Sequence, residues 1–266
     1  MSLDDLLKSA PIEIVEARIL AAHSLQWSRV QLITQSKHVL STVQVDDIQR
    51  LFQRRLQGEP IAYLLGQREF YGLSFEVTPA VLIPRPETEL LVELAIERMP
   101  TNARVLDMGT GSGAIAVSLA HTRPDSTFFA TDVSKQALAV AERNSLLHQT
   151  AITFFQSNWY EHVNGRFDLI VSNPPYIRAG DVHLSQGDLR FEPADALTDH
   201  STGFTAIEKI IHRAHVHLER SGWLMLEHGY DQASTVRELF HTSIWSDVQS
   251  WCDLAGIERV TGARLL

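Results

Sequence analysis

The sequence predicts an α/β protein in which a mostly parallel sheet, with helices on both faces, follows a small helical domain. Beyond Glu87, helical stretches alternate with short apolar runs bounded by glycines, as in successive βαβ units. Before Gly66, apolar residues recur mainly at helical spacing. At 266 residues and 44% hydrophobic content, the chain is long enough for one large and one small domain.

Residues 1–66 are expected to form the helical domain. Apolar side chains at helical spacing predict helices over residues 12–27 and 45–56. Gly58 supplies a helix stop, and Pro60 disfavours helix at the residue before it. The second helix should therefore end near Gly58.

Residues 67–86 are expected to form a linker. Two short runs rich in aromatic and β-branched residues flank Gly72, which predicts a β-hairpin. Pro79, Pro84 and Pro86 then stiffen the exit from the hairpin.

Residues 87–266 are expected to form the α/β domain. Five buried strands are predicted near residues 104–107, 127–131, 152–155, 167–172 and 223–227. Helices are predicted between them, for example at 114–120 and 205–218, and another at 232–240. A terminal strand pair at 248–252 and 258–264 completes the sheet.

Charge and cysteine content limit the partners and the compartment. The chain has 32 Asp and Glu against 23 Lys and Arg, a formal charge of -9, so it does not attract phosphate backbones as a whole. The single Cys252 agrees with a reducing compartment, and we expect it to be buried on a strand. No basic leader or apolar run of about 20 residues is present. We expect a soluble, cytoplasmic protein.

A glycine-rich loop follows the first predicted strand of the sheet. The run Gly109-Thr110-Gly111-Ser112-Gly113 lies between that strand and the helix at 114–120. Glycines at such a junction let the backbone approach a nucleotide and admit positive φ. The next strand ends at Asp132, about 20 residues further on, where an acid suits ribose hydroxyls. Together the loop and the acid predict a nucleotide-containing cofactor.

The glycine spacing alone leaves the cofactor open. Gly109, Gly111 and Ala114 also satisfy the G-x-G-x-x-A pattern of dinucleotide-binding folds, and Asp132 is expected in either case. Asp107, directly before the loop, would repel a pyrophosphate but could interact with the cationic amino-acid moiety of S-adenosylmethionine. The sequence therefore favours S-adenosylmethionine, and an NAD-dependent oxidoreductase is the alternative.

A rigid polar loop, Asn173-Pro174-Pro175-Tyr176, follows the strand predicted at 167–172. Ligands in open α/β sheets bind outside the carboxyl ends of the strands. Two prolines fix φ twice, so their carbonyl oxygens can face a pocket rigidly. The Asn173 side-chain oxygen and the Pro174 main-chain oxygen could accept both hydrogens of an -NH2 group and direct its nitrogen toward a methyl donor. Tyr176 could pack on the planar acceptor.

The chemistry of the acceptor explains why such a loop would be catalytic. An amide or aromatic amine is a poor nucleophile because its lone pair is delocalised. Hydrogen bonds that favour pyramidal nitrogen are strongest near the transition state, where they lower the barrier. Asn173 and Pro174 are therefore the predicted catalytic residues. No metal site is expected, because His212, His215 and His217 form no recognisable ligand set.

Five further segments narrow the prediction to one family. They are residues 58–66 (GEPIAYLLG), 82–89 (LIPRPETE), 190–193 (RFEP), 226–229 (LEHG) and 258–260 (ERV). With the two loops, they make nearly the whole chain resemble the bacterial peptide chain release factor glutamine methyltransferases of the HemK/PrmC type. The acceptor loop by itself is shared with DNA and RNA methyltransferases.

The resemblance implies a fold and a reaction. The fold is that of class I methyltransferases, Rossmann-like, with a mostly parallel seven-stranded sheet. The reaction methylates the glutamine side-chain amide in the Gly-Gly-Gln motif of class 1 release factors, which supports translation termination. S-adenosylmethionine is the donor and S-adenosylhomocysteine the product. The helical domain helps to bind the protein substrate.

The resemblance also implies roles for individual residues. The glycine loop from Gly109 to Gly113 and Asp132 hold the cofactor, Trp159 packs near its adenine, and Asn173 touches both cofactor and acceptor. The residues from Asn173 to Tyr176 form the glutamine pocket. The chain departs from the family pattern at Asn158, where an acid usually precedes the tryptophan.

The main alternative acceptor is an exocyclic amine of a DNA or RNA base, which presents the same flat -NH2 group and could be delivered by base flipping. The acidic net charge and the lack of a basic, aromatic-laced segment argue against it. A non-catalytic nucleotide-binding protein is a third possibility, although it leaves the acceptor loop unexplained. We expect release factors as partners, no direct binding to nucleic acid or membrane, and a monomer.

Three further residues are noted without a firm role. Arg85 and Glu87 are candidates either for the substrate groove or for an interdomain salt bridge. His228 lies at a predicted strand end and has no assigned chemistry.

Overall fold

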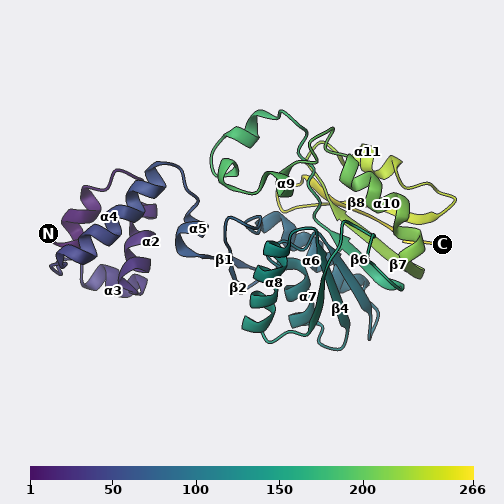
Figure 1. Cartoon of the computed structure of the whole chain (residues 1–266), viewed down its shortest axis with the longest axis horizontal. Helices are drawn as coiled ribbons and strands as arrows, with labels where there is room; N and C mark the ends of the chain where they lie inside the picture. Colours follow the sequence, from purple (N-terminus) through teal and green to yellow (C-terminus); the bar gives the residue numbers. More distant parts are fainter.

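The computed structural model describes residues 1–266, and Figure 1 shows a cluster of short helices at one end and an α/β domain at the other, joined by a hairpin. The cluster contains α1 (Leu3–Lys8), α2 (Ile14–Leu25), α3 (Arg29–Thr34), α4 (Thr42–Leu56) and α5 (Ile61–Leu65). Its own core includes the fully buried Leu20, Ile48 and Phe52. The two helices predicted in this part are confirmed as α2 and α4.

Helices α1 and α3 were not predicted. Each has six residues, too few for a helical apolar repeat to stand out. Each begins with a capping box, in which Ser2 pairs with Asp5 and Ser28 pairs with Gln31. Ser41 caps α4 in the same way, so that helix begins at Thr42, a few residues earlier than expected.

The linker contains the predicted hairpin, formed by β1 (Gln67–Phe70) and β2 (Leu73–Glu76). Its two turn residues, Tyr71 and Gly72, have positive φ. The Tyr71 amide donates to Glu89 Oε1 at 2.9 Å, and the buried Phe70 and Phe75 join the core of the α/β domain. The hairpin is therefore packed on that domain.

One sheet of seven strands runs in the order β5-β4-β3-β6-β7-β9-β8. Neighbouring strands in the run β5-β4-β3-β6-β7 are parallel, and β9 is antiparallel to both β7 and β8. This arrangement confirms the predicted fold class. The strands are β3 (Arg104–Met108), β4 (Thr127–Asp132), β5 (Ile152–Gln156), β6 (Phe167–Ser172), β7 (Leu218–Glu227), β8 (Trp245–Cys252) and β9 (Glu258–Leu265). Cys252 is exposed, contrary to expectation, because it is the last residue of the edge strand.

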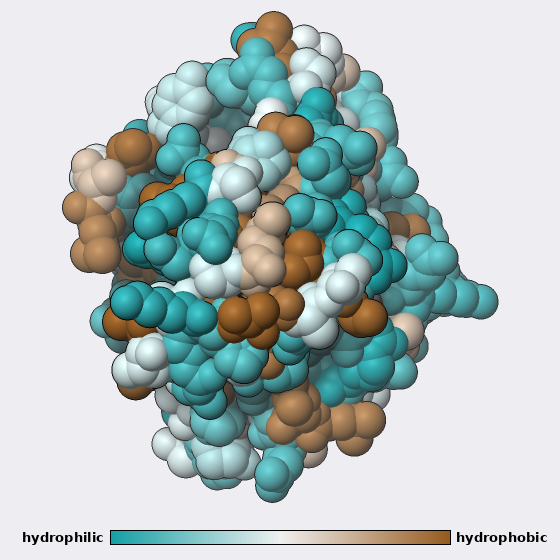
Figure 2. All heavy atoms as spheres, turned by 90° about the vertical axis from the view of Figure 1, so that its left-hand side faces the viewer, coloured by the Kyte–Doolittle hydropathy of each residue, from teal (hydrophilic) through white to brown (hydrophobic).

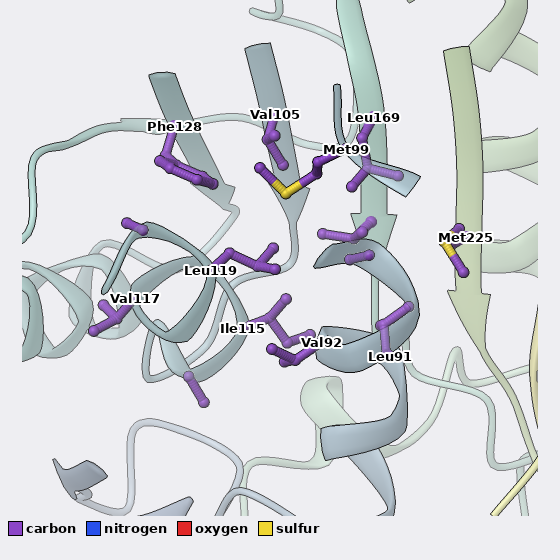
Figure 3. Packing of buried hydrophobic residues seen from close by; sticks show 14 of the residues in the cluster. Leu91, Val92, Met99, Val105, Ile115, Val117, Leu119, Phe128, Leu169 and Met225 are labelled. Carbon is purple, nitrogen blue, oxygen red and sulfur yellow. The ribbon is translucent and has the colours of Figure 1, made fainter. Parts of the chain in front are cut away.

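Helices cover both faces of the sheet. On one face, α6 (Glu89–Arg98) and α7 (Ala114–Thr122) pack on alternate strand residues such as Val105, Leu169 and Met225, as Figure 3 shows. On the other, α10 (Thr205–His217) and α11 (Ala233–Glu238) pack on the side chains that point the opposite way. Helix α8 (Lys135–Leu147) lies beside β4, β5 and the hairpin. No helix combines the length and apolar character needed to cross a membrane.

Strand register brings four strand ends together. Met108 of β3 lies opposite both Thr131 of β4 and Ser172 of β6, and Ser172 lies opposite Leu226 of β7. Carboxyl ends of parallel strands meet at one edge of a sheet. The next residue of each chain segment therefore reaches the same edge: Gly109, Asp132, Asn173 and Glu227.

A long segment, which we call the 178–201 loop, extends from the α/β domain toward the helical cluster and appears in green in Figure 1. It contains η2 (Val182–Ser185), η3 (Leu189–Phe191) and α9 (Ala194–Leu197), none of which was predicted. Asp188 Oδ1 accepts from Arg55 Nη1 at 3.0 Å, and Arg190 Nη2 donates to the Gln57 carbonyl at 2.6 Å. The loop thus contacts both parts of the molecule.

The glycine at the start of α7 should tolerate no side chain. Gly113 has a φ of 82°, and a Cβ there would lie 3.2 Å from Ala141 Cα. We expect Gly113→Ala to lower the free energy of unfolding in urea by about 2 to 4 kcal/mol, from backbone strain and overpacking. Gly256→Ala is the matched control, because Gly256 has a φ of 78° with nothing within 4 Å. Equal losses in the two variants would contradict this packing argument.

Candidate active site

The glycine loop turns from β3 into α7 at the carboxyl edge of the sheet. Gly109, Gly111 and Gly113 have φ of 72°, 56° and 82°, a region that other residues enter only with strain. The amides of Gly109 and Thr110 both donate to the Thr131 carbonyl at 2.9 Å. The loop is therefore anchored to the end of β4.

Asp107 lies beneath this loop. Its side chain turns under the start of α7, where Oδ2 accepts from Thr110 Oγ1 at 2.6 Å and from the Ala116 amide at 3.3 Å. Oδ1 has no partner, and burial raises the pKa of Asp107 to about 7. Asp107 does not itself line the cavity above the loop. Its visible role is to hold the loop.

A cavity of about 490 Å³ opens above the loop and is lined by residues from several parts of the chain. Six of the predicted site residues line it: Gly109, Gly111, Asp132, Trp159, Asn173 and Pro175. The other five do not: Thr110, Ser112, Gly113, Pro174 and Tyr176. Of these, Thr110, Ser112 and Pro174 are buried, and Ser112 accepts at its carbonyl from Asn144 Nδ2 at 2.8 Å.

Asp132 and Trp159 form two walls of the cavity. The Asp132 carboxylate accepts from the amides of Gly111 and Ser134, each at 2.9 Å, so its position is fixed by the backbone. Burial raises the pKa of Asp132 above its usual value. The Trp159 ring lies 3.7 Å from the place where a Cβ on Gly109 would be, so the indole lies beside the glycine loop. Asn158 lines the cavity beside it and donates to Glu161 Oε1 at 2.9 Å.

These walls fit a nucleoside cofactor. The cradle of Gly109 and Gly111 presents backbone without side chains, and a carboxylate stands where ribose hydroxyls can donate. The indole of Trp159 offers a flat apolar face of the kind on which bases stack. The unfilled Asp107 Oδ1 beneath the cradle is compatible with a cationic ligand group.

The acceptor loop presents two unfilled oxygen acceptors. Asn173 Nδ2 donates to Thr88 Oγ1 at 3.2 Å, while Asn173 Oδ1 has no hydrogen bond within the protein. The main-chain oxygen of Pro174 accepts none either. Gln232 Nε2 donates to the Tyr176 carbonyl at 3.1 Å and braces the far end of the loop. The loop is held from both sides, and these two oxygens accept no hydrogen bond within the protein.

Tyr176 is directed toward a buried carboxyl rather than into the cavity. Its hydroxyl donates to Glu227 Oε1 at 3.1 Å, and its ring packs against the core that α10 and α11 cover. Burial raises the pKa of Tyr176 well above its usual range. Burial likewise raises the pKa of Glu227 to about 7, although the hydroxyls of Thr88 and Tyr176 act to lower it.

Sequence reasoning missed Thr88, Glu227 and Gln232 as partners of the acceptor loop. Thr88 and Glu227 lie in the 82–89 and 226–229 segments that carry the family resemblance, so a signal was present without a stated role. It also missed the wall that the 178–201 loop contributes to the cavity through Pro193, Asp195, Ala196, Thr198, Asp199 and His200.

Two of the three residues without a firm role, Arg85 and His228, have structural partners. Arg85 forms an ion pair with the buried Glu192 of the 178–201 loop. Glu87 is exposed. His228 is buried, with Nδ1 bonded to the Gly229 carbonyl at 2.9 Å and Nε2 to Thr261 Oγ1 at 2.8 Å.

The buried Glu227 should make stability depend on pH. Its pKa rises from 4.5 to about 7 on folding, so the native state holds the proton more tightly than the unfolded chain. This contribution is complete below pH 4.5 and is lost as the pH rises through about 7. We expect Glu227→Gln to gain up to about 3 kcal/mol relative to wild type between pH 4.5 and 8, measured by urea unfolding. A stability difference that stays constant over this range would contradict the assigned pKa.

Known proteins share both parts of this chain. The family model of the PrmC N-terminal domain matches residues 3–66, and that of the methyltransferase small domain matches residues 86–197. Among solved structures, a methyltransferase from Pyrococcus furiosus has a TM-score of 0.57 at 20% identity, over 80% of this chain and 96% of that one. A 16S rRNA N2 G1207 methyltransferase of T. thermophilus, solved with AdoMet and guanosine, has a TM-score of 0.56 at 19% identity, over 75% of this chain and 50% of that one. These structures show the class I methyltransferase fold.

Several relatives of high sequence identity align with nearly the whole of this chain. The release factor glutamine methyltransferase of Burkholderia pseudomallei is 50% identical over 98% of this chain and 95% of its own length. That of Bordetella pertussis is 48% identical over 99% of both chains. This chain therefore belongs to the family of release factor glutamine methyltransferases.

Proposed function

We propose that this enzyme transfers a methyl group from S-adenosylmethionine to the side-chain amide nitrogen of the glutamine in the Gly-Gly-Gln motif of class 1 release factors. One structural observation supports the proposal in addition to family membership. Two unfilled oxygen acceptors, Asn173 Oδ1 and the Pro174 carbonyl, belong to the loop that borders the glycine-lined cavity. Such a pair matches the two hydrogens of a primary amide.

The chain's own residues would hold the cofactor in a defined orientation. When bound, S-adenosylmethionine supplies an electrophilic methyl group on its sulfonium. Gly109 and Gly111 let it approach the backbone, Asp132 accepts from its ribose hydroxyls, and Trp159 packs near the adenine. Thr110, Ser112 and Gly113 support these contacts from beneath by keeping the loop in shape.

The acceptor amide would be oriented by Asn173 and Pro174. Two acceptor bonds hold its hydrogens and turn the nitrogen lone pair toward the methyl group. These bonds strengthen as the nitrogen becomes pyramidal, so they stabilise the transition state more than the ground state. Pro175 completes the rigid wall, and Tyr176 borders the glutamine pocket. The amide proton becomes acidic once the nitrogen is methylated, so no strong base is required beforehand.

A protein acceptor suits the surface better than a nucleic acid. The net charge of -9 provides no general attraction to phosphates, and the cavity wall contributes Asp195 and Asp199. Figure 2 shows apolar residues scattered among polar ones at the helical end of the molecule, where Val30, Ile33 and Val39 are exposed. We therefore assign that end to protein substrate binding. In this account the enzyme acts as a cytoplasmic monomer.

Replacing the central amide tests the proposal directly. We expect Asn173→Ala to lower kcat for methylation of a purified release factor by at least about 100-fold, as for loss of one hydrogen-bonding group at a developing charge. The affinity for S-adenosylmethionine should change far less. Asn164→Ala, an exposed asparagine outside the cavity, is the control and should keep wild-type kcat. Undiminished kcat in Asn173→Ala would exclude the proposed role.

Removing the indole tests the cofactor assignment. We expect Trp159→Ala to raise the Kd for S-adenosylmethionine about 10-fold or more in calorimetric titration, because base stacking on an aromatic ring contributes roughly 1 to 3 kcal/mol. Trp27→Ala in the helical cluster is the matched control and should leave this Kd unchanged. An unaltered Kd in Trp159→Ala would show that the adenine does not bind against this indole.

A further inference from the structure

The side-chain amide of Asn173 has two ends, and only one is useful for the proposed reaction. Its oxygen can accept a hydrogen bond from an acceptor -NH2 group, whereas its nitrogen is a donor. With the amide reversed, donors would face donors and the acceptor nitrogen would be misdirected. Something in the protein must therefore fix which end faces the cavity.

Thr88 is placed to do so. Its buried hydroxyl accepts from Asn173 Nδ2 at 3.2 Å, which engages the nitrogen and leaves Oδ1 as the end of the amide without a partner in the protein. Thr88 precedes α6 but makes no side-chain cap bond to that helix. A threonine in this position commonly caps the helix. Here its hydroxyl is committed to Asn173 instead.

A hydroxyl alone does not determine the direction of the bond. It can donate or accept, so Thr88 by itself would serve either end of the Asn173 amide. Above its raised pKa of about 7, Glu227 breaks this ambiguity, because the ionised carboxylate only accepts. The Thr88 hydroxyl acts to lower the pKa of this carboxyl, and Oε2 of Glu227 has no hydrogen-bond partner. The Thr88 proton therefore has an available acceptor behind it.

We propose that Thr88 and Glu227 are positioning residues, which turn Nδ2 of Asn173 inward and thereby present Oδ1 to the acceptor amide. Donation then runs in one direction, from Asn173 to Thr88 and from Thr88 toward Glu227. Tyr176 donates to the other carboxylate oxygen, so Glu227 also ties the two ends of the acceptor loop together. This inference rests on the proposed function and names two further residues that serve it.

Two substitutions at Thr88 separate this role from packing. Thr88→Val removes the hydroxyl at nearly constant shape, and Thr88→Ser keeps it. For methylation of purified release factor, we expect Thr88→Val to lower kcat about 10- to 100-fold, with KM for the factor and Kd for S-adenosylmethionine within about threefold of wild type. Thr88→Ser should restore kcat to within about threefold. Ser118→Ala, which removes a buried hydroxyl from α7, is the control and should behave as wild type.

The substitution Glu227→Gln is the second test of the positioning role. Glutamine can donate to Thr88 as well as accept, so the direction of donation is lost. In assays at about pH 8, where wild-type Glu227 is ionised, we expect kcat to fall about 10-fold with binding unchanged. The inference is overturned if Thr88→Val keeps wild-type kcat, if Val and Ser variants lose activity equally, or if the loss lies in cofactor affinity. A wild-type enzyme that does not methylate the factor would instead overturn the proposed function and, with it, this inference.

Discussion

Strand register is the constraint on which the site depends. Because β4, β3, β6 and β7 are adjacent and parallel, the residues at or directly after their carboxyl ends arrive at one edge without any long-range pairing of side chains. In the spatial order of these strands, their ends carry the ribose acid, the glycine cradle, the acceptor amide and the buried carboxyl. A slip of one residue in β6 would place the Asn173 side chain on the other face of the sheet.

Two buried carboxyl groups lie near this edge of the sheet. Asp107 and Glu227 are both buried, each has an oxygen without a partner, and burial raises the pKa of each to about 7. Ionised groups in such places oppose folding, so they are uncommon unless they serve a site. One holds the cofactor loop from below, and the other lies behind the acceptor loop. We infer that the two buried carboxyl groups lower the stability of the fold and, in the same positions, keep the two loops rigid.

Most of the fold could be predicted from the sequence, because its strands are apolar, bounded by glycines and separated by helices of sufficient length. The short helices α1 and α3 were not predicted, because neither shows a helical repeat of apolar residues, although Ser2 and Ser28 mark their starts. The two loops were recognisable from local pattern. The contact between Thr88 and Asn173 joins residues 85 positions apart, and nothing in either segment alone specifies it. The sequence likewise does not reveal that the Asp107 side chain turns under the start of α7 and accepts from Thr110 and Ala116.

The central claim is that the acceptor is a protein amide. The most direct measurement is transfer of radiolabelled methyl from S-adenosylmethionine to a purified class 1 release factor, with a factor whose Gly-Gly-Gln glutamine is replaced, and with DNA and RNA, as competing acceptors. This account predicts label on the unaltered factor alone, at the glutamine. Label on nucleic acid, or equal label on the altered factor, would contradict it.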